Sequence, residues 1–367
     1  MNLSEEELYW YWLYNIEGIG IISCKKLLEY YHSPKEVFHH ADKNTIEALK
    51  ITKKATESLL ESRDLEHVLR NAKSVLDQNI KIITYANESY PKRLKNIYNP
   101  PGVLYLRGDM PSNDKPTIAI VGARSCSNYG KELATYYAKE LARNDVQVIS
   151  GLARGIDSFA HQGALHEIGK TYAILGSGID ICYPRDNINL YMDIIKYGGI
   201  LSEYPIGYKP LQGNFVMRNR IISGVADGIL IVEARERSGS LITLEYGLEQ
   251  GKNIYACPGR VFDELSYGTN RTIQQGGKLI LDIEDILEDF FIERTNTGKN
   301  MKKNNYVLER GEKIVYDILS LMPKHLEDIM NESGLKMNQV SEILCNLQLK
   351  GIVKQTSGNY FCSVINK

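Results

Sequence analysis

The chain contains 367 residues, of which 43% are hydrophobic, and its 44 basic and 45 acidic side chains leave a net charge of −1. This length predicts two or three domains, and the near-neutral charge excludes a global basic field, so any nucleic-acid surface must be a local patch. An acidic N-terminus, the lack of any apolar run near the roughly 18 residues of a membrane span, and six cysteines without Cys-x-x-Cys spacing predict a cytoplasmic protein without membrane contact, disulfides or zinc.

The first 80 residues are expected to form a small helical domain. Leu8, Trp10 and Trp12 lie in a crowded apolar stretch that indicates a buried helix, and Gly18 and Gly20 then interrupt it. Such a break resembles a helix-hairpin-helix or SAM-like turn, which can present backbone N–H groups to a phosphate. We favour the simpler interpretation, a tight turn between packed helices that uses the backbone freedom of glycine. Residues 80–114, with several prolines, predict a short strand-and-loop connector.

From residue 117 the pattern changes to short apolar runs that alternate with helical windows. The runs are Ile118–Val121, Val146–Ile149, Tyr172–Leu175, Gly199–Leu201, Ile229–Val232 and Asn253–Cys257. Fully apolar strands separated by helices are typical of a mostly parallel sheet that helices cover on both faces. We therefore predict an α/β, Rossmann-like domain over residues 81–293, with any ligand at the carboxyl ends of its strands.

Arginine, glycine and one aromatic residue collect in the loops and helices that follow these strands. The candidate binding residues of this kind are Gly122, Arg124, Arg154, Phe215, Arg218 and Arg220. They are scattered in sequence, but the predicted fold brings them to one rim. Arginine offers forked donors to phosphate oxygens, and a phenylalanine ring offers a face on which a base can stack. The set predicts a site that holds a single-stranded polyanion without cutting it.

A turn of small residues, Ser238, Gly239 and Ser240, follows the fifth strand and opens the next predicted helix. The first N–H groups of a helix have no partner within it and stabilise an anion placed against them. We therefore include all three residues of this turn in the predicted DNA-binding site.

A structural role competes for two of the arginines. Arg218 and Arg220 could each pair with a carboxylate and seal the sheet instead of facing a ligand. The candidate partners are Glu203, Glu233 and Asp227. We interpret Asp157 and Asp180 in the same way, as groups that orient arginines or cap helices rather than perform chemistry.

The C-terminal part of the chain predicts a linker and a further small domain. Residues 294–306 are polar and lack periodicity, which is typical of a linker. Residues 307–367 follow the order helix, helix, turn, helix, hairpin, which indicates a winged helix-turn-helix domain. Its candidate recognition helix, residues 337–350, is poor in arginine. Base recognition and protein docking therefore both stay open as its role.

No catalytic, metal or cofactor site is evident in the sequence. Residues 163–171 place five residues between two glycines where a Walker loop has four, and they enter a strand instead of a helix. The run Gly176-Ser177-Gly178 lacks the third glycine of a dinucleotide fingerprint. His161 and His166 have no carboxylate with an evident place in a metal set.

Taken together, these residues resemble the DNA-processing protein A family (DprA, also called Smf). The matching motifs are Gly122-Ala123-Arg124-x-x-Ser127-x-Tyr129-Gly130, Ser150-Gly151-Leu152-Ala153-Arg154-Gly155-Ile156-Asp157, Gly176-Ser177-Gly178-Ile179-Asp180, Tyr183-Pro184, Ser202-Glu203-Tyr204-Pro205, Phe215-x-x-Arg218-Asn219-Arg220 and Ser238-Gly239-Ser240-Leu241-Ile242-Thr243. Each motif alone is weak, but the set in this order is highly specific from about residue 90 to residue 280.

The resemblance implies a protein that binds single-stranded DNA, protects it and helps load the RecA recombinase during natural transformation. It also implies a homodimer formed through the Rossmann-like domain. By position, Arg124 corresponds to the family's DNA-contacting arginine of the first glycine loop, and Phe215, Arg218 and Arg220 correspond to its Phe-x-x-Arg-Asn-Arg element. Residues 271–277 depart from the family's more apolar pattern in the region where we expect the dimer contact.

Two other functions fit parts of the sequence. The sheet type also resembles nucleotide phosphoribohydrolases, whose catalytic loop has the pattern Gly-Gly-x-Gly-Thr-x-x-Glu. Here Glu245 matches the final glutamate, but Leu241 and Ile242 replace the Gly-Thr pair. A transcriptional regulator led by the winged helix would require specificity for duplex DNA. We predict that the chain is not an enzyme and needs no cofactor.

Overall fold

The computed structural model describes residues 3–294, 308–320, 323–356 and 358–364. The chain forms two compact units, one of residues 1–125 and 134–293 and the other of residues 126–133 and 294–367. The predicted linker, residues 294–306, lies outside the described residues except for residue 294. No helix in the described part of the chain is both long enough and apolar enough to cross a lipid bilayer.

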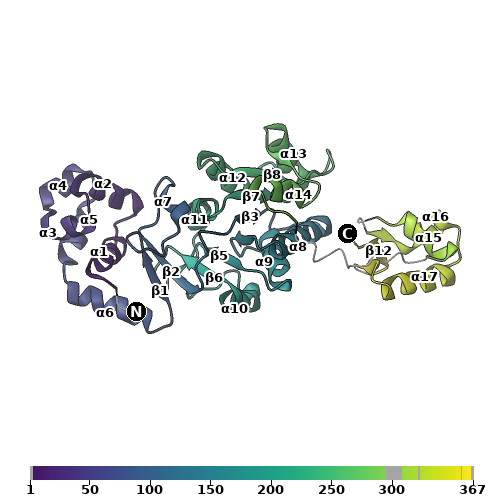
Figure 1. Ribbon diagram of the computed structural model, residues 1–367, viewed down its shortest axis with the longest axis horizontal. Coiled ribbons are helices and arrows are strands. Elements are labelled where there is room, and N and C mark those ends of the chain that lie inside the picture. The colour runs from purple at the N-terminus through teal and green to yellow at the C-terminus, as the bar shows by residue number, and fades with distance from the viewer. Residues whose placement is uncertain (1–2, 295–307, 321–322, 357, 365–367) are drawn as a thin grey trace. The chain divides into compact units, whose positions relative to one another are not determined.

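A nine-stranded sheet is the centre of the first unit (Figure 1). Its strands are β1 (Lys81–Thr84), β2 (Val103–Gly108), β3 (Thr117–Val121), β4 (Gln147–Ser150), β5 (Thr171–Leu175), β6 (Gly199–Ser202), β7 (Gly228–Ile231), β8 (Asn253–Ala256) and β9 (Lys278–Leu279). They lie in the order β1-β2-β6-β5-β4-β3-β7-β8-β9. The seven strands from β3 to β9 are parallel, whereas β2 is antiparallel to both β1 and β6. The predicted mostly parallel sheet is confirmed.

Helices cover both faces of this sheet, as predicted. The helices of this region are α7 (Lys92–Lys95), α8 (Asn128–Arg143), α9 (Ile156–His166), α10 (Ile188–Tyr197), α11 (Gln212–Val225), α12 (Gly239–Glu249), α13 (Tyr267–Gln274) and α14 (Glu284–Leu287). Right-handed crossovers from β4 to β6 move in one direction along the sheet, so α9 and α10 cover one face. The crossovers from β6 to β8 move in the opposite direction and place α11 and α12 on the other face (Figure 1).

The connector predicted over residues 80–114 is more than a connector, because two of its segments extend the sheet. The register pairs Ile82 with Tyr105, and Tyr105 in turn with Ser202 of β6. Both strands are short, and proline-containing turns flank β2, so local periodicity marked them weakly. The pairing of β2 to β6, which also attaches β1, is a long-range property that the chain acquires only when the sheet forms.

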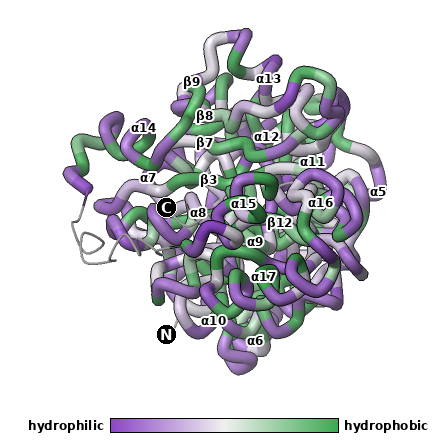
Figure 2. The backbone as a smooth tube through the Cα atoms, turned by 90° about the vertical axis from the view of Figure 1, so that its right-hand side faces the viewer, coloured by the Kyte–Doolittle hydropathy of each residue, from purple (hydrophilic) through white to green (hydrophobic). Residues whose placement is uncertain are grey.

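Apolar side chains fill the space on each side of the sheet. Ile174, Ile221 and Ile229 belong to the core beneath α11, and all three are fully buried. The apolar strands β3 and β7 are green in Figure 2, as expected for parallel strands that are covered on both faces. Burial of this kind is the main favourable term in folding, and it leaves the ends of the strands as the accessible part of the sheet.

The N-terminal helical domain shares a core with the sheet. Its helices are α1 (Glu5–Tyr14), α2 (Ile21–Tyr31), α3 (Pro34–His40), α4 (Lys43–Ala48), α5 (Lys53–Glu61) and α6 (Leu65–Leu76). Trp12 and Leu27 belong to one buried cluster with Tyr105 of β2, whose hydroxyl donates to Asn15 Oδ1 at 2.7 Å. Gly18 adopts φ +83° in the tight turn before α2, in agreement with the simpler interpretation of this segment.

The second unit contains the predicted helices and hairpin. Its elements are α15 (Arg310–Ile318), β10 (Lys324–His325), α16 (Leu326–Ser333), α17 (Met337–Leu349), β11 (Val353–Gln355) and β12 (Tyr360–Ser363). The three strands form a small antiparallel sheet in the order β10-β12-β11. Val315, Ile329, Val340 and Leu344 build its core. Three helices followed by a hairpin match the layout expected of a winged helix-turn-helix domain.

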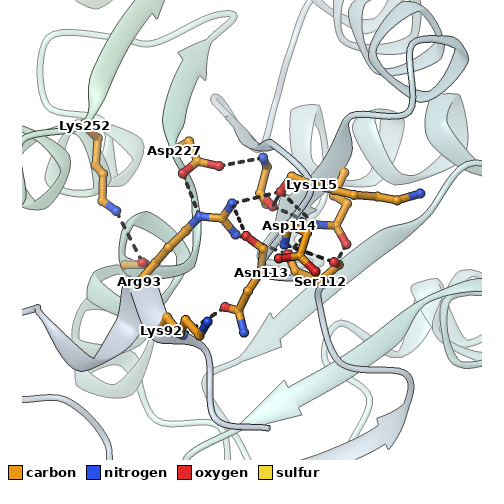
Figure 3. Close-up of polar contacts among 11 residues, drawn as sticks. Lys92, Arg93, Ser112, Asn113, Asp114, Lys115, Asp227 and Lys252 are labelled. Carbon is orange, nitrogen blue, oxygen red and sulfur yellow. Dashed lines mark hydrogen bonds and ion pairs between the residues drawn. The ribbon is translucent and has the colours of Figure 1, made fainter. Parts of the chain in front are cut away.

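Arg93 of α7 forms hydrogen bonds with residues at the amino-terminal edge of the parallel strands (Figure 3). Its Nε donates to Asp227 Oδ1 at 2.6 Å, and its other nitrogens donate to the carbonyl oxygens of Ser112, Asn113 and Lys115 at 2.9–3.3 Å. Asp227 Oδ2 accepts from Thr117 N at 2.9 Å. One guanidinium therefore joins the start of β7, the start of β3 and the loop before β3.

We expect Arg93→Ala to lower the free energy of unfolding of the full chain by roughly 2–3 kcal/mol, because it removes the ion-pair partner of the half-buried Asp227 and one donor from each of three carbonyl groups. Two of these carbonyl groups, those of Ser112 and Lys115, keep Gln147 Nε2 as a second donor. Urea unfolding followed by circular dichroism measures the change. Arg70→Ala is the matched control, since Arg70 forms only an exposed pair with Glu66 at 3.7 Å and such pairs contribute little. Equal losses in the two variants would contradict the role of Arg93.

Candidate functional site

The candidate residues gather at the carboxyl ends of the parallel strands, around the N-terminal half of α11. The chain leaves β3 toward one side of the sheet and β7 toward the other. Ligand crevices of open α/β sheets lie at such a divergence. Gly122 lies at this point, and a Cβ atom there would come within 2.7 Å of Ile156 Cγ1 and 2.9 Å of Glu233 O. Glycine thus permits the close approach of β3, β7 and α9.

Phe215 lies in the first turn of α11 against the loop after β5. A Cβ atom on Gly176 would lie only 2.7 Å from the ring, so the ring packs directly on the glycine backbone. Tyr183 stacks on the same ring with centroids 5.4 Å apart and an interplanar angle of 30°. The guanidinium of Arg124 lies 5.8 Å from the centroid of the Phe215 ring. An exposed arginine and two aromatic faces therefore meet at one place.

Arg218 lies one turn further along α11, and its side chain points into the protein. It is 4% exposed. Its Nη1 donates to Gly151 O at 2.8 Å and also to Ile174 O. Burial lowers the pKa of Arg218 to about 10, partly offset by the nearby carboxylate of Asp157, so the group is cationic at neutral pH. Arg218 joins the ends of β4 and β5.

Asn219 continues this set of contacts from α11 to the turn that opens α12. Its Oδ1 accepts from Arg218 Nε at 3.3 Å, and its Nδ2 donates to Gly239 O at 3.3 Å. Ser238 is the N-cap residue of α12, but its hydroxyl pairs with that of Ser240 at 2.8 Å and no side chain caps the first turn. This leaves the amides at the start of α12 uncapped by side chains, as an anion site requires.

Arg220 is buried on the opposite side of α11 from Phe215, with an exposure of 3%. Its Nη2 donates to Glu203 Oε2, in the loop after β6. Burial raises the pKa of Glu203, and Arg220 counteracts that shift. Among the described residues, Arg220 Nε, Arg220 Nη1 and Glu203 Oε1 have no hydrogen-bond partner. The pair closes the space between α11 and the end of β6.

The structure thus corrects one expectation about the rim. Arg218 and Arg220 do not present their guanidinium groups to solvent, because backbone carbonyls and a buried carboxylate occupy them. The alternative in which Arg220 pairs with Glu203 is confirmed. Arg218 instead satisfies carbonyl groups, and Asp227 is bound to Arg93. In this conformation both arginines position the loops around the rim instead of reaching a ligand.

Arg124 and Arg154 are the two candidate arginines whose side chains are exposed. Arg124 lies beside Phe215. It is also close enough to Arg218 for its positive charge to lower the pKa of the Arg218 guanidinium. Arg154 donates to Asp186 Oδ2 at 2.6 Å, and both side chains of this pair are mostly exposed. Exposed pairs are worth little, so a phosphate could replace the carboxylate at small cost.

The carboxylates near the rim have structural partners. Asp157 is buried, which raises the pKa of its carboxyl group, and it accepts from the amides of Gly151 and Ala153. Asp180 accepts from the amide of Gly207 at 2.9 Å. Both therefore hold loops by accepting from backbone amides, and within the described part of the chain neither forms the predicted hydrogen bond to an arginine or helix cap.

Two tyrosines at the rim were missed as candidates. Tyr183 and Tyr208 are about half exposed, and Tyr208 stacks on Tyr204 with centroids 5.0 Å apart. Tyr183 and Tyr204 belong to the motifs that resemble the family, but tyrosine occurs throughout the chain. The composition therefore could not show which tyrosines lie at the rim and which lie in the core.

Other reactive groups of this region are embedded in the fold. His161 of α9 is fully buried, and its Nδ1 lies 2.7 Å from Thr171 Oγ1. None of the six cysteines, all of which the structure describes, forms a disulfide. Within the described ranges, no three His, Cys, Asp or Glu side chains are placed to hold a metal ion. The accessible features of the rim are cations, aromatic faces and helix amides.

Two family models match the chain. Residues 81–291 match the model described as DNA recombination-mediator protein A, and residues 303–359 match the DprA winged helix domain. DNA processing protein DprA of Bacillus subtilis is 42% identical over 214 residues, which are 58% of this chain and 72% of that protein. Protein Smf of Synechocystis sp. is 28% identical over 390 residues and covers 97% of this chain and 98% of its own length. The winged-helix prediction is confirmed.

Solved structures show the same similarity. DprA of Streptococcus pneumoniae superposes with a TM-score of 0.66 at 32% identity and covers 80% of this chain and 99% of its own. DNA processing protein A of Helicobacter pylori, studied for its single-stranded DNA binding mode, gives a TM-score of 0.52 at 30% identity, with 57% of this chain and 96% of its own covered.

The buried histidine predicts a pH dependence of stability. Burial lowers the pKa of His161 to about 3 from an ordinary value of 6.5. Below pH 6.5 the unfolded chain therefore binds a proton that the folded chain excludes, and acid favours unfolding. Between pH 6 and pH 5 we expect His161→Gln to remove a slope of about 1.4 kcal/mol per pH unit from the free energy of unfolding. Urea titrations at each pH measure it.

His166→Gln, which changes an exposed histidine of the same helix, is the matched control for this comparison. Identical slopes in the wild type and in His161→Gln would show that His161 does not resist protonation in the folded chain.

Proposed function

This chain belongs to the DNA recombination-mediator protein A (DprA/Smf) family, and we propose that it binds and protects single-stranded DNA without cutting it. The observation that carries the proposal is the cluster of exposed Arg124, the Phe215 ring and the stacked Tyr183 at the carboxyl edge of the sheet. Cations that track a backbone, combined with aromatic faces for the bases, bind single strands without sequence preference.

The roles of the nine candidate residues divide into two groups in this proposal. Arg124 and Arg154 contact phosphates, Phe215 stacks on a base, and the amides at Ser238–Ser240 receive a further phosphate. Gly122 permits the close packing that brings these groups together. Arg218 and Arg220 act indirectly, since they hold the loops after β4, β5 and β6 in place. Arg218 also adds a buried positive charge behind the rim.

The position of Glu245 disfavours the phosphoribohydrolase alternative. Glu245 lines a separate hollow between α12, β8 and α13, together with Tyr255, Arg271 and Lys278. Neither Phe215 nor the turn at residues 238–240 lines that hollow. A glutamate in this position does not face the ligand that we propose for the rim.

We expect Arg124→Glu to weaken binding of oligo-dT by about tenfold or more at 0.1 M salt. The slope of log K against log salt should also fall by about 0.7, the value for one lost phosphate contact on a single strand. Phe215→Leu keeps the apolar volume but loses the stacking face, and should weaken binding roughly 5- to 150-fold. Fluorescence anisotropy with labelled oligo-dT and with duplex DNA measures both effects.

Arg70→Glu, on the exposed face of α6, is the matched control for the charge change and should bind as the wild type does. Unchanged oligo-dT affinity in Arg124→Glu would show that the site is misplaced. Preference for duplex DNA would favour the transcriptional regulator, and release of free base from a nucleoside monophosphate would favour the enzyme.

We further propose that the chain acts as a homodimer formed through the Rossmann-like domain and helps load a RecA-type recombinase during natural transformation in the cytoplasm. Family membership supports this role. In a strand-exchange assay, the wild type should speed RecA assembly on strands precoated with single-strand binding protein, whereas Arg124→Glu should not. Light scattering tests the dimer. Equal stimulation by both proteins would separate recombinase loading from the proposed site.

A further inference from the structure

A second hollow, of about 400 Å³, lies where the N-terminal helices meet the sheet. It is formed by α1, α2, the residue after β1 and the loop before β2. Its lining residues include Trp10, Tyr14, Lys25, Tyr85, Tyr98 and Asn99. This hollow lies apart from the rim, and four aromatic side chains and a lysine line its concave surface.

Three of the aromatic rings form a ladder. Trp10 lies 5.1 Å from Tyr85 and 5.9 Å from Tyr14 between ring centroids, with interplanar angles of 31° and 28°. Trp12 of the same helix is 3% exposed, and its Nε1 donates to Ser62 Oγ at 2.9 Å, as expected of a core tryptophan. Trp10 is only half buried and lines the hollow.

Cations lie on these rings. Lys25 Nζ lies 4.0 Å from the centroid of Tyr98, and Lys95 Nζ lies 5.1 Å from the centroid of Tyr85. One carboxylate, Glu29, lies 3.8 Å from Lys25. Tyr98 is 74% exposed, so most of its ring surface is open to solvent. Aromatic faces with adjacent ammonium groups suit a ligand that alternates flat rings and phosphates.

The hollow opens at the same edge of the sheet as the rim. Because β1 runs parallel to β6 and β2 runs antiparallel to it, the end of β1 and the start of β2 lie at the carboxyl edge of β6. Tyr85 N donates to Gly102 O at this edge. Tyr14 lies close enough to the Arg220–Glu203 pair for both charges to affect the pKa of its hydroxyl. The buried pair therefore lies between the rim and the hollow.

The distance between the two sites suits a short stretch of a single strand. Four neighbour steps separate β3, which Arg124 follows, from β2 in the sheet order. At about 4.8 Å per step the separation is about 19 Å, the length of a few nucleotides of an extended single strand. The stacked pair Tyr204–Tyr208 follows β6 and lies between them in the sheet order.

We propose that this hollow is a second base-binding subsite for the same single strand, which runs from the rim over Tyr204 and Tyr208 to the Trp10 ladder. The inference rests on the proposed function and extends it, because it adds the N-terminal domain to the DNA path. One or two bases stack against the exposed ring of Tyr98, beside the Trp10 ladder, and Lys25 and Lys95 meet the adjoining phosphates.

The test uses the full chain and its two tryptophans. We expect dT20 to quench the fluorescence of Trp10, and Trp10→Phe to abolish this signal. The double substitution Tyr98→Ala with Lys25→Ala removes exposed or half-exposed side chains, and should weaken dT20 roughly 5- to 50-fold. It should leave dT2, which is too short to span both sites, bound at the rim as in the wild type. Tyr30→Ala with Lys54→Ala, which alters exposed residues of the same domain outside the hollow, is the matched control.

Three results would overturn the proposal, and they are distinguishable. If dT20 binds and Arg124→Glu weakens it, but Trp10 is not quenched and the Tyr98/Lys25 variant matches its control, the strand takes another path and the proposed function stands. A hydrophobic peptide that quenches Trp10 where dT20 does not would assign the hollow to a protein partner. If the wild type does not bind dT20 at all, the proposed function fails and this subsite fails with it.

Discussion

The guanidinium of Arg218 is the contact on which the geometry of the rim depends. It donates to carbonyl groups at the ends of β4 and β5 beneath α11, where a buried carbonyl group is costly to leave unpaired. One rigid, always charged fork satisfies both through Gly151 O and Ile174 O. A Cβ atom on Gly151 would lie 2.5 Å from the guanidinium, so the glycine and the arginine depend on each other.

The other residues of the Phe-x-x-Arg-Asn-Arg element extend this arrangement along the sheet edge. Phe215 rests on Gly176, Asn219 holds the carbonyl of Gly239, and Arg220 binds Glu203. A single helix thus fixes the loops after four strands. The buried Arg218 can still act electrostatically at the rim, because a buried cation acts through a medium of lower dielectric constant than water. Under the proposed function, the buried arginines hold the loops in place and the exposed Arg124 contacts the ligand.

The amino and carboxyl ends of the parallel strands differ in which groups they leave accessible. At the amino edge, Arg93 directs four of its five N–H donors to Asp227 and three carbonyl groups, so its guanidinium is engaged within the fold. At the carboxyl edge, exposed rings and an arginine stay available to solvent. Strands β1 and β2 extend the carboxyl edge beyond β6 as far as the N-terminal helical domain. These two strands and the helical domain share a core. The N-terminal helices are therefore part of the same surface and not an appended module.

Much of this protein follows from the sequence by itself. Six apolar runs predicted six of the seven parallel strands to within one or two residues, because a strand buried on both faces is apolar throughout, and the motifs after those strands identified the family. The short, less buried β9 was not among them. The directions of Arg218 and Arg220 could not be predicted, since they depend on acceptors at Gly151, Ile174 and Glu203 that are 17 to 67 residues away. The incorporation of β1 and β2, and the hollow around Trp10, were likewise decided by tertiary structure. Local periodicity reports whether a residue is buried, but only the assembled sheet determines which groups lie within its reach.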